Sequence, residues 1–197
     1  NKVENENKDK DEVKVEEEEV ALETFVEANI ENSLIKLEIV DENNDKIIKS
    51  VSCDNNEITY NLSPTQKLAI ITDANQNLSL VDIEGTVKDL TLKEYVSPYG
   101  ESFYKDNILQ LYEGYLWHAD ARFISDSMIV YISNIPYFGY SKLDKYLSLV
   151  DLNTMVHSTI WGTNSQEITF GDYSTDGLTV NLDGNIRTIY NDGTMNR

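Results

Sequence analysis

Few residues in this sequence have the type and spacing that a catalytic or metal site needs. The chain has two histidines, His118 and His157, which lie far apart in the sequence. His118-Ala119-Asp120 would place two potential ligands on one face of a strand, because side chains alternate between faces. A zinc site, however, needs three or four ligands. Nothing in the spacing brings His157 near His118, so we expect both to be structural or surface histidines.

The segment Asp73-Ala74-Asn75-Gln76-Asn77 places oxygen ligands at alternate positions, and Glu84 falls at the twelfth position, as in a calcium-binding loop. Leu78, however, stands where such a loop needs glycine for its sharp turn. A plain hairpin turn is therefore the favoured interpretation. Cys53 is the one cysteine, so no disulfide forms within the chain, and no basic residue flanks it to activate the thiol.

The sequence also contains no Gly-x-Ser-x-Gly elbow, no phosphate-binding glycine loop and no paired-cysteine metal pattern. It therefore predicts no cofactor and no metal, and it favours a protein that is not an enzyme. An enzyme whose site follows none of these motifs is the alternative.

Aromatic residues gather in two stretches, 92–118 and 134–146, which we expect to be insertions in a regular scaffold. Clustered Tyr and Trp side chains are typical of protein interfaces. We predict Tyr137, Phe138 and Tyr140 as binding residues, because they lie in a loop with Pro and Gly. Tyr115 and Trp117 are further binding candidates, although packing in the core is the favoured alternative for them. The same rings could also stack on sugars.

The scaffold that must position these loops is visible as a repeat. Leu78-Ser79-Leu80-Val81-Asp82 returns as Leu147-Ser148-Leu149-Val150-Asp151, and Leu37-Glu38-Ile39-Val40-Asp41 is a near copy, 41 residues before the first. An apolar run that ends in Asp and leads into a turn predicts a buried strand followed by a hairpin. Turn residues follow each copy, and a second β-type segment comes after them.

A second motif consists of an aromatic residue or Leu, a polar turn and a β-branched strand. It occurs at Leu62–Gln66, Phe123–Ser127 and Tyr173–Gly177. These segments resemble the Phe-Ser-Pro-Asp-Gly hairpin of TolB-like (WD40-like) β-propeller blades, over about residues 33–190. In that family the turn joins the first two strands of a blade, so Asp126 and Asp176 are expected to be structural.

The resemblance implies an all-β fold, a β-propeller-like array of antiparallel hairpin units with about three to four degenerate blades. Only the units 57–91 and 119–161 look complete, and the first piece lacks its opening strands. The count reaches four if 92–116 hides a degenerate blade, and propellers need about four. These motifs do not determine whether the blades close into a ring. An open array, a β-sandwich of the same hairpins or a fragment of a longer propeller are the alternatives.

The charge of the chain limits its partners. The sequence has 35 acidic and 16 basic residues and a net charge of −19, which disfavours nucleic acids and anionic membranes. We expect residues 1–19 to be a poorly ordered acidic tether and residues 20–197 to form the propeller-like domain. Residues 20–30 fit a helix or a strand, and the all-β context favours a strand.

The charged spacer resembles the region after the lipid-anchored cysteine of a bacterial surface lipoprotein, although that anchor is not in this sequence. The resemblance implies an extracytoplasmic protein, at the cell surface or secreted, with membrane contact only through such an anchor. The leading hypothesis is a non-enzymatic binding module that engages a protein partner at the bacterial cell envelope. The alternatives are binding of a glycan such as cell-wall polysaccharide, with Asn134 and Asp144 beside the rings, or an accessory domain of an enzyme outside this chain.

Overall fold

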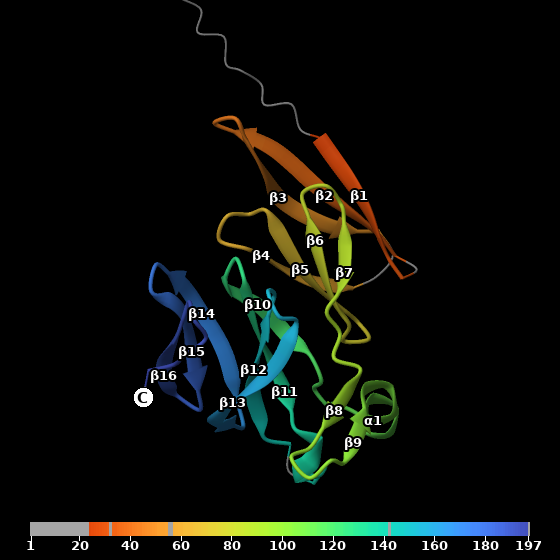
Figure 1. Ribbon diagram of the computed structural model, residues 1–197, viewed down its shortest axis with the longest axis vertical. Helices are drawn as coiled ribbons and strands as arrows, with labels where there is room; N and C mark the ends of the chain where they lie inside the picture. Colours follow the sequence, from red (N-terminus) through yellow and green to blue (C-terminus); the bar gives the residue numbers. More distant parts are fainter. Residues whose placement is uncertain (1–23, 32, 55–56, 142, 197) are drawn as a thin grey trace, which may run out of the picture.

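The computed structural model describes residues 24–31, 33–54, 57–141 and 143–196, and in these residues the protein is all-β. The predicted tether and residues 20–23 lie outside the described residues. Four antiparallel sheets, each built from consecutive strands, follow one another along the chain (Figure 1). The first two consist of β1 (Thr24–Ile30), β2 (Ser33–Glu42) and β3 (Asp45–Cys53), then β4 (Ile58–Leu62), β5 (Leu68–Asp73), β6 (Leu78–Asp82) and β7 (Val87–Asp89). The last two consist of β10 (Ala119–Ser125), β11 (Met128–Asn134), β12 (Lys145–Asp151) and β13 (Val156–Ser165), then β14 (Ile168–Ser174), β15 (Gly177–Leu182) and β16 (Asn185–Tyr190).

The four sheets pack face to face in sequence order, and each interface holds its own apolar core. The first core joins residues of the first and second sheets, among them Leu37 and Ile71. The next core joins the second and third sheets through residues such as Ile70 and Ile129. The last joins the third and fourth sheets, where Val130 belongs to the same cluster as Val180. Each inner sheet is therefore covered on both faces.

Burial on both faces explains the composition of the inner strands. On β5, Ile70 faces the third sheet while Ile71 faces the first. On β11, Ile129 and Val130 likewise belong to different cores. A strand that is buried on both sides needs apolar residues at consecutive positions rather than at alternate ones. This accounts for the continuous apolar runs in the sequence.

The hairpins predicted from the repeat are confirmed. The two full copies of the five-residue segment form β6 and β12, each the third strand of a four-stranded sheet, and the near copy lies in β2. The turn between β2 and β3 uses Asn43 and Asn44, both at positive φ, which Asn tolerates better than most residues. The two sheets predicted to be complete have four strands each. The first sheet has three strands, one fewer than these two sheets, because β1 precedes β2 and pairs with it.

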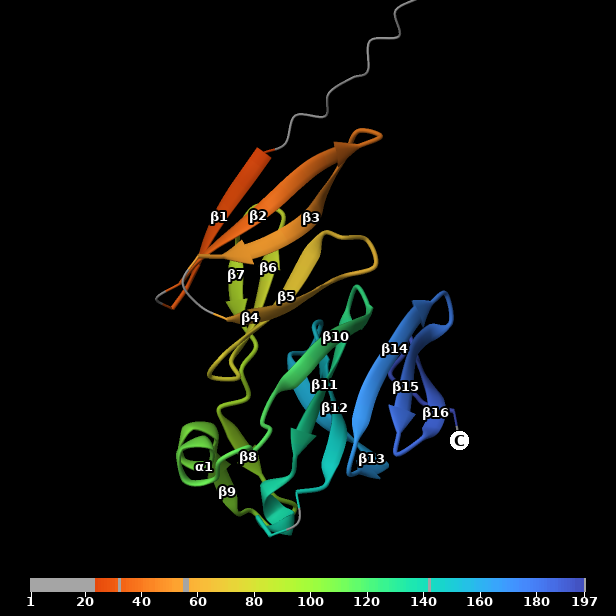
Figure 2. The same ribbon diagram turned by 180° about the vertical axis from the view of Figure 1, so that it is seen from behind.

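The array is open within the described residues, since no apolar core joins the first sheet to the last. Figure 2 shows the two end sheets at opposite ends of the series. Neighbouring sheets are also joined by polar contacts. Asp126 accepts hydrogen bonds from the Thr65 backbone N–H at 3.1 Å and from its hydroxyl at 2.7 Å. The structural role predicted for Asp126 is thus confirmed, as a link between two sheets.

The stretch 92–118 is not a degenerate blade. It forms a two-stranded hairpin of β8 (Glu94–Val96) and β9 (Ser102–Tyr104), followed by α1 (Lys105–Leu111). No helix is predicted here from the pattern of residues. The helix buries Lys105 and Ile108, which are three residues apart and so share one face. Neither α1 nor the short 3-10 helix η1 (Pro136–Phe138) has the length that a membrane crossing needs, and the described residues contain no other helix.

Candidate functional site

The two predicted insertions meet in space and share one aromatic cluster. Residues of 92–118, including Ile108 and Tyr115, pack with Tyr140 and Leu143 of the second stretch. The rings of Tyr112 and Tyr140 stack with their centroids 3.7 Å apart and their planes 7° apart. This cluster holds the two insertions together at the end of the third sheet, where Figure 1 shows β8, β9 and α1 beside β11.

Tyr115 and Trp117 belong to the interior of this cluster, with exposed fractions of 1% and 4%. The indole N–H of Trp117 donates a hydrogen bond to the Leu92 carbonyl at 2.6 Å. Burial raises the pKa of the Tyr115 phenol far above its ordinary value, and its hydroxyl is buried without a hydrogen-bond partner in the described structure. Both residues are packed in the core, as the favoured alternative expects, so neither offers a surface contact, although Trp117 also lines the hollow described below.

Exposed rings nearby form a continuous surface, which we call the aromatic patch. Tyr99 stacks on Tyr137 at 5.7 Å between centroids, and Tyr137 meets Phe138 at 5.5 Å. Phe138 in turn contacts Tyr146 at 5.8 Å and Trp161 at 6.4 Å. Tyr99, Phe138 and Trp161 have exposed fractions of 83%, 54% and 59%. Exposed aromatic side chains in mutual contact mark interaction sites more often than single exposed ones do.

The patch contains two of the three loop residues predicted to bind, Tyr137 and Phe138. The third, Tyr140, is half-buried against Tyr112 and serves mainly to pack the two insertions together. Sequence reasoning missed Trp161 as a surface residue, because it lies on a strand, β13, and not in a loop. Trp161 lies where the register of the β12–β13 pair shifts, between the paired residues Ile160 and Ser165, and its side chain is exposed there.

Beside the patch lies a hollow of about 500 Å³, which we call the aromatic hollow. Its walls include the rings of Tyr95, Trp117, Tyr131 and Trp161. Trp161 therefore belongs to both the hollow and the patch. Glu94 is the one Asp, Glu, Lys or Arg among the described residues that line this hollow, and His157 also lines it. The volume is typical of small-ligand sites, which span about 300–1,000 Å³.

The floor of the aromatic hollow is a network of hydrogen bonds. The Ser133 and Ser148 hydroxyls lie 3.0 Å apart, and the Tyr131 hydroxyl lies 3.0 Å from His157 Nδ1. Burial lowers the pKa of His157, an effect that a hydrogen bond with the Leu90 backbone partly opposes. A neutral imidazole that donates to the Leu90 carbonyl accepts at Nδ1, so the Tyr131 O–H is the donor in this pair.

The structure brings together the two histidines that the sequence spacing left apart, with ring centroids 6.0 Å from each other. His118 is fully buried, and this burial lowers its pKa to about 3. Asp120 does not join it, because its carboxylate pairs with Arg122 Nε at 2.7 Å. No group of three metal-binding side chains occurs in the described ranges. His118 is therefore a structural residue, as predicted.

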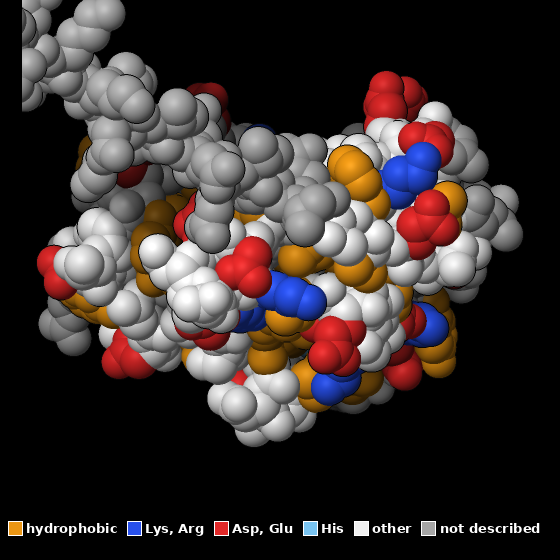
Figure 3. All heavy atoms as spheres, turned by 90° about the horizontal axis from the view of Figure 1, so that it is seen from above, with side chains coloured by type: hydrophobic (Ala, Val, Ile, Leu, Met, Phe, Trp, Pro, Cys, Tyr) orange, Lys and Arg blue, Asp and Glu red, His pale blue; other side chains and the backbone are white. Residues whose placement is uncertain are grey.

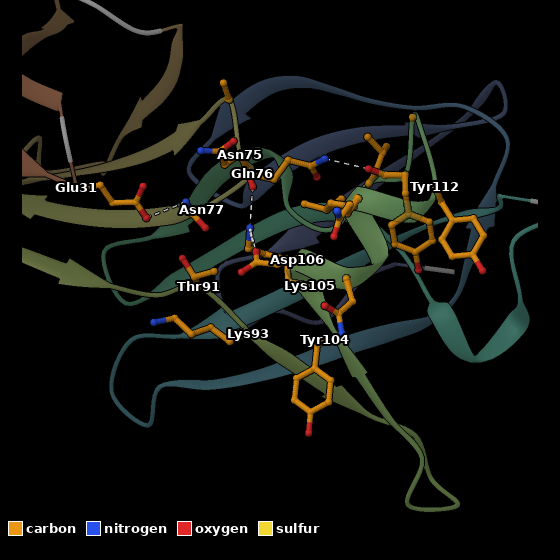
Figure 4. A pocket seen from close by; sticks show the side chains of 17 residues that line it. Glu31, Asn75, Gln76, Asn77, Thr91, Lys93, Tyr104, Lys105, Asp106 and Tyr112 are labelled. Carbon is orange, nitrogen blue, oxygen red and sulfur yellow. Dashed lines mark hydrogen bonds and ion pairs between the residues drawn. The ribbon is translucent and has the colours of Figure 1, made fainter.

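A second hollow, which we call the polar hollow, has a volume of about 1,110 Å³, and its lining includes Gln76, Tyr104 and Lys105 (Figure 4). The Lys105 side chain is 5% exposed, and its ammonium donates to the Asn75 carbonyl at 2.8 Å. The ammonium also pairs with the exposed Asp106 carboxylate at 3.1 Å. The Asp73 carboxylate accepts from the Asn77 backbone N–H at 2.8 Å, so the predicted hairpin turn is confirmed.

Asn134 is not available to a ligand. It is 5% exposed, and its Oδ1 accepts the Leu116 N–H at 2.7 Å. Its amide nitrogen donates to the Leu143 and Asp144 carbonyls. The expectation that Asn134 flanks a stacked sugar is therefore wrong, because the side chain serves to fix the loop that carries the patch.

Comparisons with known proteins leave the family of this chain open. No family model matches the sequence, and no curated protein matches it. Among solved structures, the chain is similar to the crystal structure of TolB from Acinetobacter baumannii, with 15% sequence identity and a TM-score of 0.48. The match covers 88% of this chain and 40% of the TolB chain, so this chain spans less than half of that protein. The all-β architecture is established by the strands of the chain itself.

Proposed function

We propose that this protein is a non-enzymatic binding module that engages a protein partner at the cell envelope through the aromatic patch. The observation that carries the proposal is the contact of five surface rings, Tyr99, Tyr137, Phe138, Tyr146 and Trp161, contributed by both insertions and by β13. Tyr and Trp are enriched among the residues that dominate binding energy in protein interfaces.

The shape of the patch favours a protein over a flat sugar ring. The planes of Phe138 and Trp161 lie at 89° to each other, and those of Tyr146 and Trp161 at 75°. Such a surface is ridged, and side chains of a folded partner fit between its ridges better than a single flat face does. The envelope location is supported by the resemblance of the acidic spacer to that of surface lipoproteins.

The charge of the module indicates a partner with a basic face. The chain carries a net charge of −19, and Figure 3 shows acidic side chains scattered over the face at the end of the first sheet. Asp144 lies close enough to Tyr146 to raise the pKa of its phenol, an effect second to that of burial. Complementary charge speeds encounter and excludes acidic partners.

A second candidate function is glycan binding in the polar hollow. The side-chain amides of Asn75, Asn107 and Gln110 line this hollow, are exposed and have no hydrogen-bond partner among the described residues. Tyr104 lies at the same hollow with its ring exposed. Free amides next to an aromatic ring match the hydroxyls and apolar faces of a sugar.

The proposal is tested by crosslinking followed by reconstitution. A photo-reactive residue at position 99 would trap a partner in the envelope fraction, and the trapped protein would then be purified and its affinity measured. The patch variant carries Tyr99→Ser, Phe138→Ser and Trp161→Ser. The control variant carries Phe25→Ser, Tyr60→Ser and Tyr190→Ser, three exposed rings elsewhere on the chain.

We expect the purified partner to bind the wild type and the control alike, and to bind the patch variant about 100-fold more weakly. Equal binding to all three proteins would overturn the proposal. Recovery of polysaccharide alone, with binding lost in an Asn107→Ala, Gln110→Ala variant, would establish the second candidate instead. Crosslinks between copies of this chain, together with a dimer in sedimentation, would show that the partner is a second copy of the chain and not a different protein.

A further inference from the structure

We propose that the aromatic hollow receives an Arg or Lys side chain of the protein partner, with Glu94 pairing the cation and the rings enclosing its stem. This inference rests on the proposed function, because it assumes a partner seated on the adjoining aromatic patch. It specifies what that partner must present: a cationic side chain that projects beyond its contact with the patch.

The first observation is the carboxylate of Glu94. This side chain lines the hollow, is half-buried, and has no hydrogen bond or ion pair with any described residue. Among the neighbouring acidic residues, Asp89 binds Lys93 at 3.0 Å and Asp106 binds Lys105, whereas Glu101 and Glu113 are exposed to solvent. A carboxylate that is partly removed from water gains most from a cation that forms charge-assisted hydrogen bonds.

The second observation is the set of rings that line the same hollow as Glu94. Tyr95, Trp117, Tyr131 and Trp161 line the hollow, and the apolar side chains of Leu92 and Pro136 complete its walls. Aromatic faces attract ammonium and guanidinium groups, most strongly where water is excluded. Apolar walls also cover the methylene stem that carries such a group. A small inorganic cation would gain nothing from them.

The third observation is that the floor does not favour an anion. The Tyr131 O–H is already donated to His157, the Ser148 hydroxyl donates to the Tyr131 oxygen, and the Ser133 hydroxyl then donates to Ser148. Burial lowers the pKa of His157, so the imidazole is neutral at neutral pH and does not repel a cation. Oxygen lone pairs remain as acceptors, which suit the N–H groups of a guanidinium or ammonium.

The fourth observation is continuity with the patch. Trp161 lines the hollow and contacts Phe138 and Tyr146 of the patch. A partner that covers Phe138 therefore lies at the mouth of the hollow. The net charge of −19 draws a basic partner toward this chain from a distance.

The test titrates the purified protein with blocked amino acids and follows Trp fluorescence and NMR shifts. The cationic probes are Nα-acetyl-arginine amide and Nα-acetyl-lysine amide. The neutral probes are the corresponding citrulline and norleucine derivatives, which keep the size but not the charge. We expect the cationic probes to bind about tenfold more tightly than the neutral ones, with shifts at Trp161 and Tyr95.

Glu94→Gln should weaken binding of the cationic probes about tenfold and leave the neutral probes unchanged. Glu113→Gln is the matched control, because it removes the same charge at an exposed position of the insertion outside the hollow, and it should change nothing. Equal binding of charged and neutral probes would overturn the inference, as would the same loss in both variants. Tighter binding of 1,5-diaminopentane than of the blocked lysine would overturn the choice of a protein side chain.

The probes need no partner, so the two proposals fail separately. If the probes do not bind while a reconstituted partner still depends on Tyr99 and Phe138, only the hollow is misassigned. If the probes bind with the expected charge dependence but no partner depends on those two rings, the hollow recognises cations without the proposed interface. That second outcome would overturn the assignment of the occupant to a partner.

Discussion

The side chain of Gln76 holds the backbone at Trp117. Its Oε1 accepts the Trp117 N–H at 2.7 Å and the His118 N–H at 3.2 Å, while its Nε2 donates to the Tyr115 carbonyl at 2.9 Å. Gln76 lies in the turn between β5 and β6, so this one amide joins the second sheet to the segment that carries the buried rings. The Lys105 ammonium adds a further link from the insertion to this turn, through the Asn75 carbonyl.

Gln76→Ala should destabilise the protein strongly, because it leaves three buried or partly buried backbone groups without partners. At about 1 kcal/mol for each lost partner, we expect a decrease of about 3 kcal/mol in the free energy of unfolding, measured with urea. Asn75→Ala is the control, since that side chain is exposed and unpaired in the described residues, and it should change stability by less than about 0.5 kcal/mol. Equal midpoints for the two variants would contradict the prediction.

Tyr115→Phe should stabilise the protein. The hydroxyl of Tyr115 is buried without a hydrogen-bond partner in the described structure, and removal of an unsatisfied buried group saves its desolvation cost of about 1 kcal/mol. Tyr131→Phe is the opposite case, because its hydroxyl donates to His157 at 3.0 Å, and it should lower stability by a similar amount. The melting temperatures of both variants test this prediction, and a lower melting temperature for Tyr115→Phe than for the wild type would refute it.

His118 should remain neutral in the folded protein well below neutral pH. Burial lowers its pKa to about 3, whereas an unfolded chain titrates near 6.5. Folding favours the neutral imidazole. The contribution of His118 to the free energy of unfolding is therefore complete above pH 6.5 and declines by about 1.4 kcal/mol per pH unit between pH 6.5 and 3. NMR of the imidazole should show no titration from pH 7 to 5. His118→Gln should show a weaker loss of stability on acidification, and a transition near pH 6.5 would disprove the assignment.

Gly177→Ala should be far more harmful than Gly184→Ala. Gly177 has φ of +148°, and a Cβ atom there would lie 2.0 Å from the Ile189 carbonyl oxygen. Gly184 also has positive φ, +89°, but a Cβ atom there would meet nothing within 4 Å. We expect a loss of about 1 kcal/mol for Gly184→Ala from backbone strain alone. Gly177→Ala should lose several times that, or fail to yield folded protein, and equal unfolding midpoints would show that the β15–β16 pairing adapts.

The strands and hairpins could be predicted because their signals are local. Apolar runs that end in Asp and a turn lie within single hairpins, and β6 and β12 follow from them directly. The helix α1 was missed because a seven-residue segment, Lys105–Leu111, is too short to show a clear helical period. Its stability comes from the packing of Ile108 into the aromatic cluster. This contact cannot be predicted from a local sequence pattern.

The site was predicted only in part, because its assembly is tertiary. The loop rings Tyr137 and Phe138 follow from composition, but Trp161 lies at a register shift between β12 and β13, which the sequence does not reveal. The approach of His157 to His118 depends on β13 lying beside the insertion. The aromatic hollow exists only once 92–118 is folded against the third sheet, so no spacing in the sequence marks it.

Every strand in the described residues pairs with a strand next to it in the sequence. The chain therefore has low contact order with respect to its sheets, and each sheet closes only short loops, which costs little entropy. A sheet can be completed as soon as its last strand is available, before the following sheet has been synthesised. Vectorial folding, one sheet at a time from the N-terminal side, is the natural route for this protein.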